Sequence, residues 1–444
     1  MSQSPRLIFD LTTSARWSGP PSGIVRTERQ LAIFAKEVVA TSLEYSIYDL
    51  ESKSFFILKP DIVRRILAGN LVVEFGAGVP ERILRQVRKY SFLRQPRKYL
   101  LEQYYRVANW LGTNKYEYHF PRPANTISLR DATISRLEIN SSDILVSCGA
   151  DWHGKDLQAI RAEKIKTGFT YISICYDVIP WKSPQFWPEG VADSVVAYYG
   201  ELAWLADRVF CISKATAQEY RQLCDVFDIP CPALSVFRLG ETDFASVQAD
   251  KLGSAAATLP AKLQGTRYVL MVASIEPRKN HWLLYQVWQN LVSEGRIDAD
   301  VKLVFVGTGH WLTGDLMHQI RNNPLVCDRI EIISAVSDEE LSLCYENCLF
   351  TVFPSFDEGW GLPVAESLMH GKVCLASNRG SLPEISTHTV LIDPLDVYAW
   401  RDAIQEYVND DVVRSEKEKA ISQSYVGTSW KQSASQFFAT AITR

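Results

Sequence analysis

The stretch 353–376 constrains the fold more than any other part of the sequence. It is preceded by an apolar, β-rich run at 349–353, which Pro354 ends. Polar residues and glycines follow, and Pro363 suits the first turn of a helix. A second apolar run at 373–376 comes after that helix. This order of strand, loop, helix and strand predicts one βαβ unit of a parallel sheet.

The loop of this unit has the chemistry of a ligand site. Its glycines let the backbone approach a ligand, and Gly361 and Leu362 lie where a helix begins. The unpaired N–H groups and positive dipole of a helix N-terminus favour phosphate. Glu358 and Glu366 add acceptor oxygens that suit sugar hydroxyls. Solvation or the helix dipole would explain either glutamate alone, but the whole arrangement favours a nucleotide sugar, which offers both phosphates and hydroxyls.

Bulk composition sets the class of protein. A chain of 444 residues is too long for one ordinary core and predicts two α/β domains. Its net charge of −4 does not draw it to nucleic acid. No apolar run approaches the roughly 20 residues of a membrane span, and the first residues lack a signal-peptide core. We therefore expect a globular protein of the cytoplasm.

Two motifs carry a resemblance to a known family. The sequence Glu-Gly-Trp-Gly-Leu-Pro-x-x-Glu at 358–366 resembles the paired-glutamate motif of retaining glycosyltransferases of family four, which have the GT-B fold. The sequence Glu-Pro-Arg-Lys at 276–279 is similar to a second motif of that family. Tyr176-Asp-Val-Ile-Pro180 is similar to a third segment that often reads His-Asp-x-x-Pro, with tyrosine in place of histidine. Ser381 stands where a second glycine is common in the family.

The resemblance implies an α/β protein of GT-B fold, with two Rossmann-like parallel-sheet domains facing a cleft. We expect an acceptor-side domain at 1–245 and a nucleotide-sugar-binding domain at 267–425. The Ala-, Ser-, Gln- and Gly-rich residues between them predict a linker at 246–266. Residues 426–444 are expected to form a terminal helix that crosses back to the first domain.

The resemblance also assigns a donor site to the second domain. Arg278 and Lys279 are expected on the diphosphate, Glu366 on the ribose, Glu358 on the sugar, and the backbone of Val336 beside the nucleobase. Taken alone, the Arg-Lys pair would be explained by solvation. Arg278, Lys279 and Glu358 are the candidate catalytic residues. The main-chain N–H groups expected to face the donor belong to Gly359, Trp360, Gly361 and Leu362.

Candidate acceptor-side residues follow the expected strands of the first half, because ligands of parallel sheets bind outside the carboxyl ends of the strands. The first loop contributes Gly23 and Arg26, although an ordinary βα turn explains this loop equally well. The loops after the runs at 143–147 and 169–175 contribute Asp151, His153, Tyr176 and Asp177.

The implied function is retaining transfer of a hexose or deoxyhexose from a UDP- or GDP-linked donor. The expected acceptor is a glycan or a lipid-linked oligosaccharide in cell-surface polysaccharide synthesis. No cofactor or metal is expected, because two cations and a helix N-terminus already neutralise the leaving diphosphate. Cys344 and Cys348 share a helical face, but no partner ligands follow at zinc spacing.

Two other interpretations stay open at the level of sequence. The loop Gly76-Ala-Gly78 after an expected strand suggests a methyltransferase or an NAD-dependent enzyme. The basic, aromatic-rich segment 81–112 suggests contact with the inner face of the cytoplasmic membrane, and a solvated helical face explains it equally well. The same segment would suit a membrane-docked scaffold without catalysis. RNA binding ranks behind membrane contact and a solvated helical face, because no RNA-binding motif accompanies the segment.

Overall fold

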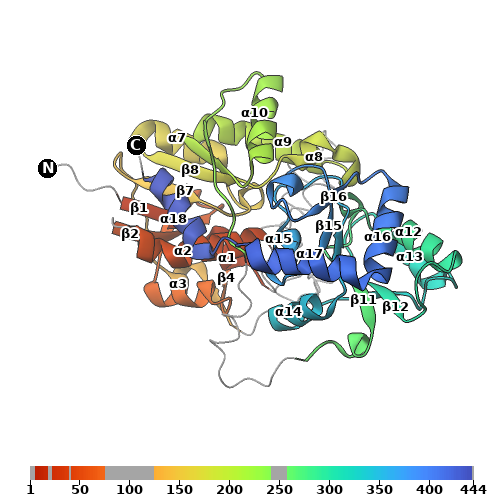
Figure 1. The fold of residues 1–444 in the computed structure, drawn as a ribbon. Helices are drawn as coiled ribbons and strands as arrows, with labels where there is room; N and C mark the ends of the chain where they lie inside the picture. Colours follow the sequence, from red (N-terminus) through yellow and green to blue (C-terminus); the bar gives the residue numbers. More distant parts are fainter. Residues whose placement is uncertain (1–5, 19–22, 40–41, 76–124, 242–257, 443–444) are drawn as a thin grey trace, which may run out of the picture. The chain divides into compact units, whose positions relative to one another are not determined.

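The computed structural model describes residues 6–18, 23–39, 42–75, 125–241 and 258–442, drawn as ribbon in Figure 1. The chain divides into two compact units, Met1–Tyr171 and Ile172–Arg444. The Gly76–Gly78 loop and the basic segment 81–112 lie outside the described residues. Within the described ranges, no helix is both long and apolar enough to cross a membrane.

The first unit contains a mixed sheet with the strand order β7-β1-β2-β3-β6. Strand β1 pairs in parallel with β2 and β7, and β3 is antiparallel to β2 and β6. The strands of this sheet are β1 (Arg6–Asp10), β2 (Ser42–Asp49), β3 (Ser54–Leu58), β6 (Thr133–Arg136) and β7 (Ile144–Ser147). A separate parallel pair is formed by β4 (Val72–Glu74) and β5 (Thr126–Ser128).

The helices of the first unit connect these strands. Helix α2 (Gly23–Val38) buries Val25, Leu31, Ala32 and Ala35 along one face. That spacing of apolar residues is typical of a helix packed on a sheet. The helices are α1 (Thr12–Arg16), α2 (Gly23–Val38), α3 (Pro60–Leu67), α6 (Leu129–Ala132), the short η2 (Asp151–His153) and α7 (Leu157–Thr167).

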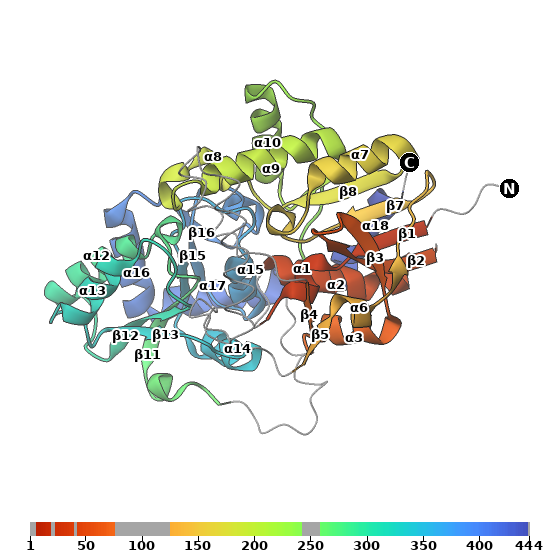
Figure 2. The ribbon, with the colours of Figure 1, turned by 180° about the vertical axis from the view of Figure 1, so that it is seen from behind.

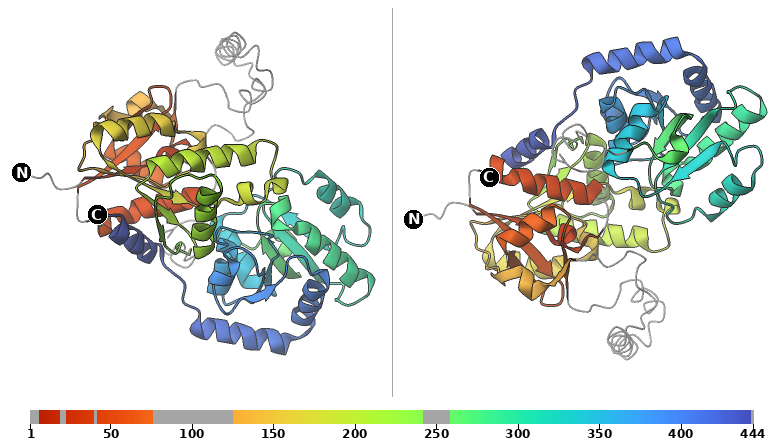
Figure 3. Two further views of the ribbon diagram at one scale, coloured as in Figure 1. Left: turned by 90° about the horizontal axis from the view of Figure 1, so that it is seen from above. Right: turned by 90° about the horizontal axis from the view of Figure 1, so that it is seen from below.

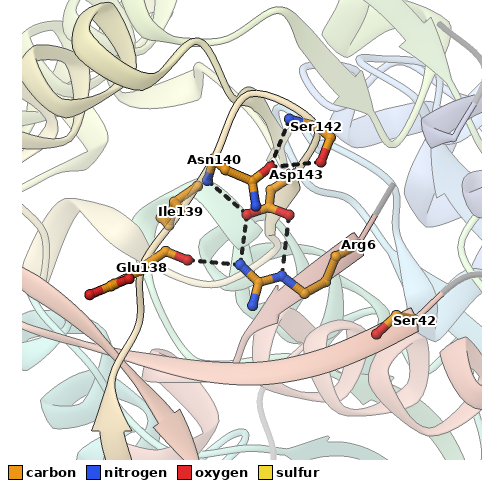
Figure 4. A pocket seen from close by; sticks show the side chains of 7 residues that line it. All are labelled: Arg6, Ser42, Glu138, Ile139, Asn140, Ser142 and Asp143. Atoms are coloured by element: carbon orange, nitrogen blue, oxygen red, sulfur yellow. Dashed lines mark hydrogen bonds and ion pairs between the residues drawn. The ribbon is translucent and has the colours of Figure 1, made fainter. Parts of the chain in front are cut away.

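Arg6 joins the amino ends of β1 and β7 in the first unit (Figure 4). Its guanidinium donates to both Asp143 oxygens, at 3.2 and 2.7 Å, to the Glu138 carbonyl at 2.8 Å and to Glu44 at 2.7 Å. The pocket around it is also lined by Ser42, Ile139, Asn140 and Ser142. Because the guanidinium is already paired and lies at the amino edge of the strands, this pocket is structural rather than a ligand site.

The second unit contains a six-stranded parallel sheet with the order β13-β12-β11-β14-β15-β16. This is the order of a doubly wound Rossmann sheet, and it reverses between β11 and β14. Ligands of such sheets bind beside the carboxyl ends of the two strands at that reversal. The strands are β11 (Arg267–Val272), β12 (Val301–Val306), β13 (Ile330–Ile333), β14 (Thr351–Phe353), β15 (Cys374–Ser377) and β16 (Val390–Ile392).

Helices cover both faces of the six-stranded sheet, with α12 and α13 on one side and α14 on the other (Figure 2). Burial on both faces explains why the central strands are nearly continuous apolar runs such as YVLMV and LVFV. The helices around this sheet are the short η4 (Ala261–Leu263), η5 (Pro277–Lys279), α12 (His281–Ser293), α13 (Gly314–Asn322), α14 (Asp338–Asn347), α15 (Leu362–Met369), the short η6 (Leu382–Glu384), α16 (Val397–Asn409) and α17 (Asp411–Ser424).

The rest of the second unit contains three parallel strands, which lie side by side in the order β10-β9-β8. The last helix, α18, follows α17 (Figure 3) and packs on this part through Phe437, whose ring centroid lies 4.2 Å from Phe210 and 5.3 Å from Phe237. The elements are β8 (Thr170–Cys175), α8 (Ile179–Lys182), η3 (Pro184–Phe186), α9 (Val191–Leu205), β9 (Arg208–Cys211), α10 (Lys214–Val226), β10 (Ala233–Val236) and α18 (Trp430–Ala441).

Candidate functional site at the carboxyl ends of β11 and β14

Asn280 fixes the loop after β11 beside the loop after β14. Its backbone is in the left-handed region (φ 59°), which asparagine tolerates better than most residues. Its amide nitrogen donates to the carbonyls of Pro354, at 3.2 Å, and Pro394, at 3.0 Å. The amide of Phe356 also donates to the Arg278 carbonyl at 2.9 Å. These bonds bring the Arg-Lys pair to the paired-glutamate loop.

Glu358 forms ion pairs with both cations of that pair. Its two oxygens lie 2.8 Å from the Arg278 guanidinium and 2.5 Å from the Lys279 amine, and Arg278 also pairs with Glu276 at 2.8 Å. All four side chains are at most 12% exposed. Burial would raise the pKa of Glu358, but the charges of Arg278 and Lys279 outweigh it and lower that pKa to about 2. Two cations and two carboxylates therefore face each other at the reversal of the strand order.

Glu366 lies in the second turn of α15. Helix α15 begins after Gly361, whose φ of 106° requires glycine. The Glu366 carboxylate is 3% exposed and accepts a hydrogen bond from the Tyr345 hydroxyl of α14 at 3.0 Å. Burial raises the pKa of Tyr345 well above its usual value, so the hydroxyl keeps its proton and donates a hydrogen bond to Glu366. Val336 packs against the same core cluster as Tyr345.

Ser381 holds the backbone of the paired-glutamate loop. Its hydroxyl donates to the carbonyls of Glu358, at 2.9 Å, and Trp360, at 2.8 Å, and its amide donates to Glu358 at 3.1 Å. Glycine, which is common here in the resembled family, would lack the two hydroxyl bonds. Gly380 precedes it with φ 58°, and a Cβ there would lie 2.4 Å from the Asp357 carboxylate.

Gly359 is the point at which the paired-glutamate loop packs on Tyr176 and Asp177. A Cβ on Gly359 would lie 2.1 Å from the Tyr176 carbonyl oxygen and 3.2 Å from the Asp177 Cβ. Asp177, expected on the acceptor side, therefore lies beside the predicted donor residues. Burial raises the pKa of Asp177, and the charge of Arg278 opposes that rise.

We expect Gly359→Ala to lower the free energy of unfolding by roughly 1–3 kcal/mol, because backbone must move to admit the methyl group. Urea denaturation measures the change. Gly200→Ala is the matched control: it lies inside α9 with nothing within 4 Å of the added Cβ, so it should stabilise the chain by about 0.5–1 kcal/mol. Equal stability of Gly359→Ala and the wild-type chain would contradict the close packing.

Several residues of the site carried no signal in the sequence analysis. The amine of Lys182, in α8, pairs with Asp357 at 2.8 Å and also with Glu219. Glu384 accepts from the amides of Lys214, at 2.9 Å, and Ala215, at 2.7 Å, at the start of α10. Glu276 lay within a motif that was recognised, and the alternation of charges in Glu-Pro-Arg-Lys could have indicated its pairing with Arg278. Lys182 and Glu384, by contrast, are distant in sequence from their partners.

The remaining acceptor-side candidates lie in the first unit. Gly23 and Arg26 belong to the first turn of α2. His153 lies in η2. Asp151 is 2% exposed, and its carboxylate pairs with Lys155 at 2.8 Å and accepts from the Ser147 hydroxyl at 2.6 Å. This carboxylate is buried among side chains of its own unit. Its ion pair with Lys155 and its hydrogen bond from Ser147 hold the turn after β7 in place.

Lys155 connects this turn to β1. Its side chain is fully buried, and its amine lies 2.5 Å from the Asp10 carboxylate and 2.8 Å from that of Asp151. We expect Lys155→Met to lower the free energy of unfolding by roughly 3–5 kcal/mol, because two buried carboxylates would lose their cation. Lys166→Met is the control, since Lys166 is 73% exposed in its pair with Glu163. Urea denaturation of both variants tests this; similar small losses would show that the buried pairs contribute little.

Within the described residues, no group of three or more His, Cys, Asp and Glu side chains is arranged to hold a metal ion. Cys344 and Cys348 are buried in the core cluster beside Tyr268.

Comparison with solved structures shows the fold. The chain aligns over 99% of its length with the sucrose-phosphate synthase of Thermosynechococcus elongatus, at a TM-score of 0.57, 16% identity and 98% coverage of that chain. It aligns over 99% with the N-terminal domain of the Candida albicans trehalose-6-phosphate phosphatase, at a TM-score of 0.60, 10% identity and 97% coverage. The predicted α/β architecture of GT-B type, with Rossmann-like parallel sheets, is confirmed.

Comparison of sequences finds a family match in the second half of the chain. Residues 260–425 match the family model described as glycosyl transferases group 1. The chain is 28% identical over 199 residues to the serotype-specific mannosyltransferase WbdA of Escherichia coli, covering 44% of this chain and 24% of that protein. It is 34% identical over 145 residues to the O-antigen chain mannosyltransferase B of Escherichia coli, covering 32% and 37%.

These alignments span well under half the length of either curated relative. The matched segment 260–425 contains all the donor residues predicted from the two motifs. The predicted resemblance to glycosyltransferases is thus confirmed for this segment, which is similar to glycosyl transferases group 1.

Proposed function

We propose that the chain is a retaining glycosyltransferase that moves a hexose or deoxyhexose from a UDP- or GDP-linked donor. The acceptor would be a glycan or a lipid-linked oligosaccharide in cell-surface polysaccharide synthesis. The observation that carries the proposal is the pairing of Arg278 and Lys279 with Glu358 where the strand order of the sheet reverses. Two relatives are named as mannosyltransferases, which favours mannose among the hexoses.

The geometry supports a separate role for each charged residue of the site. Arg278 and Lys279 would exchange their pairing with Glu358 for the donor diphosphate, assisted by the N–H groups at the start of α15. Glu358, once released, would accept from hydroxyls of the sugar. Glu366, held by the Tyr345 hydroxyl, would accept from the ribose.

Retention follows if the acceptor attacks the face that the leaving group vacates. The bond between the anomeric carbon and the diphosphate oxygen breaks, and a bond to the acceptor oxygen forms on the same face. The acceptor proton passes to the leaving diphosphate oxygen, so no enzymic base is required. The cations at 278 and 279 stabilise the charge that develops on that leaving group.

A thermal-stability screen against a panel of nucleotides and nucleotide sugars tests the proposal. We expect UDP or GDP, and one of their sugars, to raise the melting temperature, because a ligand that binds the folded state stabilises it. Transfer of the labelled sugar to a glycan then establishes the activity. Stabilisation by S-adenosylmethionine or NAD without any effect of UDP or GDP would instead support an enzyme built on the Gly76–Gly78 loop.

We expect transfer to persist in excess chelator, because Arg278, Lys279 and the N-terminus of α15 supply the positive charge that a metal would otherwise supply. The measurement is the initial rate with and without EDTA at saturating donor. Loss of activity that manganese or magnesium restores would contradict metal independence. A matched reading of the melting temperature in EDTA separates an effect on the reaction from one on the fold.

The proposal places the protein in the cytoplasm, with peripheral contact to the inner face of the membrane through the basic segment 81–112. Cosedimentation with anionic liposomes, before and after deletion of this segment, tests the contact. Equal binding of both proteins would exclude it.

A further inference from the structure

Four aromatic side chains form two stacked pairs in the second unit. Phe186 stacks on Phe356 with ring centroids 5.0 Å apart and an interplanar angle of 10°. Trp187 stacks on Trp311 at 5.1 Å and 29°. The Trp311 indole N–H donates to the Phe186 carbonyl at 2.8 Å and so joins the two pairs. These four residues are called the aromatic platform below.

The aromatic platform is continuous with the candidate donor site. Phe356 is two residues from Glu358, and its amide donates to the Arg278 carbonyl at 2.9 Å. The loop that carries Trp311 pairs with the loop after β11 through a bridge between Gly309 and Ile275. The His310 amide also donates to the Ile275 carbonyl at 2.9 Å. The loops that carry Phe356 and Trp311 are therefore both hydrogen-bonded to the loop after β11, which contains the Arg-Lys pair.

The four platform residues keep part of their surface exposed. All four residues are only partly buried, unlike the fully buried aromatic residues of the neighbouring cores. Leu312, next to Trp311, is 64% exposed and has a φ of 56°. A bulky residue in that conformation is strained, and such strain is concentrated at ligand clamps and active sites. Packing alone does not explain an exposed, strained leucine next to Trp311.

We propose that the aromatic platform is a subsite that binds uncharged sugar rings of the acceptor glycan next to the site of transfer. This inference rests on the proposed function. A pyranose ring presents C–H groups that carry partial positive charge, and the face of an aromatic ring carries partial negative charge, so the two stack. None of the four platform side chains is charged. A lipid chain would instead favour a groove of aliphatic side chains, which the platform does not provide.

Equilibrium binding of α-linked mannose mono-, di-, tri- and tetrasaccharides in the presence of UDP or GDP tests the subsite. For the wild-type chain we expect affinity to rise with length. Trp311→Ala should remove that rise, with a loss of about ten-fold for the tetrasaccharide, and Trp311→Phe should retain most of it. Trp204→Ala, which removes a 51% exposed tryptophan of α9, should bind like the wild-type chain.

If Trp311→Ala does not fold, the pair Trp187→Leu and Trp187→Phe decides, because only the second keeps an aromatic ring. Equal binding of the tetrasaccharide by both members of the pair, or by Trp311→Ala and the wild-type chain, overturns the proposal. A loss confined to lipid-linked acceptors, with lipid-free oligosaccharides bound normally, also overturns it.

Nucleotide binding separates this proposal from the proposed function. If neither UDP nor GDP stabilises the wild-type chain, the glycosyltransferase assignment fails independently of the platform. If a nucleotide stabilises every variant and oligosaccharide affinity does not depend on Trp311 or Trp187, only the platform is wrong.

Discussion

Replacing Lys279 by alanine is expected to lower the rate of transfer by at least about a hundred-fold while leaving the chain folded. A preorganised cation that stabilises a developing negative charge contributes an effect of this size. The fold should survive because Glu358 keeps its pairing with Arg278 at 2.8 Å. The measurements are the initial rate at saturating acceptor and the melting temperature of the purified variant.

Lys262→Ala is the matched control for this prediction. Lys262 also pairs with a glutamate at 2.5 Å, but it is 64% exposed and lies outside the candidate site. We expect its rate to equal that of the wild-type chain. Near-normal turnover by Lys279→Ala would remove Lys279 from the donor site, and the assignment of the Arg-Lys pair to the diphosphate would fail with it.

Replacing Glu358 by glutamine is expected to change nucleotide affinity and transfer in opposite directions. The substitution leaves Lys279 and one side of Arg278 without their carboxylate, so UDP or GDP no longer competes with Glu358 and should bind about ten-fold more tightly. Transfer should fall by a hundred-fold or more, because the carboxylate proposed to hold the sugar is lost. Calorimetry of nucleotide binding and the initial rate measure the two effects.

Glu366→Gln is the control for the sign of this effect. The Glu366 carboxylate accepts from the Tyr345 hydroxyl, and it is assigned to the ribose. We therefore expect its replacement to weaken nucleotide binding. If both variants weakened binding equally, Glu358 would be a direct ligand of the nucleotide rather than a competitor for its cations.

The pKa of Glu358 fixes the pH range of this competition. Its pKa is lowered to about 2 from an ordinary value of 4.5, so the ionised pair stabilises the fold above pH 4.5. That contribution is lost as the pH falls from 4.5 toward 2. Across the range in which transferases are assayed, Glu358 stays ionised and competes with the diphosphate for the two cations.

Local patterns in the sequence were sufficient for the βαβ unit around the paired-glutamate loop. The apolar run before Pro354 and the Gly361-Leu-Pro363 sequence predicted β14 and the start of α15, since strand and helix signals depend on neighbouring residues. The apolar run at 373–376 likewise predicted β15. The family resemblance was also legible in the sequence, because each of its two motifs lies within a few consecutive residues.

Contacts between distant residues required the tertiary structure. Lys279 and Glu358 are 79 positions apart, and the order of β11 and β14 in the sheet brings them together. Tyr345, which holds Glu366, comes from a different helix. The sequence predicted Asp151 at the end of a strand but gave no sign that Lys155 and Asp10 bury it.

The sequence by itself determined the strand, loop and helix of the stretch 349–376 and the family motifs, because those signals arise from residues within a few positions of one another. Only the tertiary structure decided which charges are paired. An ion pair depends on distance in space, and strand order and buried packing, rather than local propensity, set that distance.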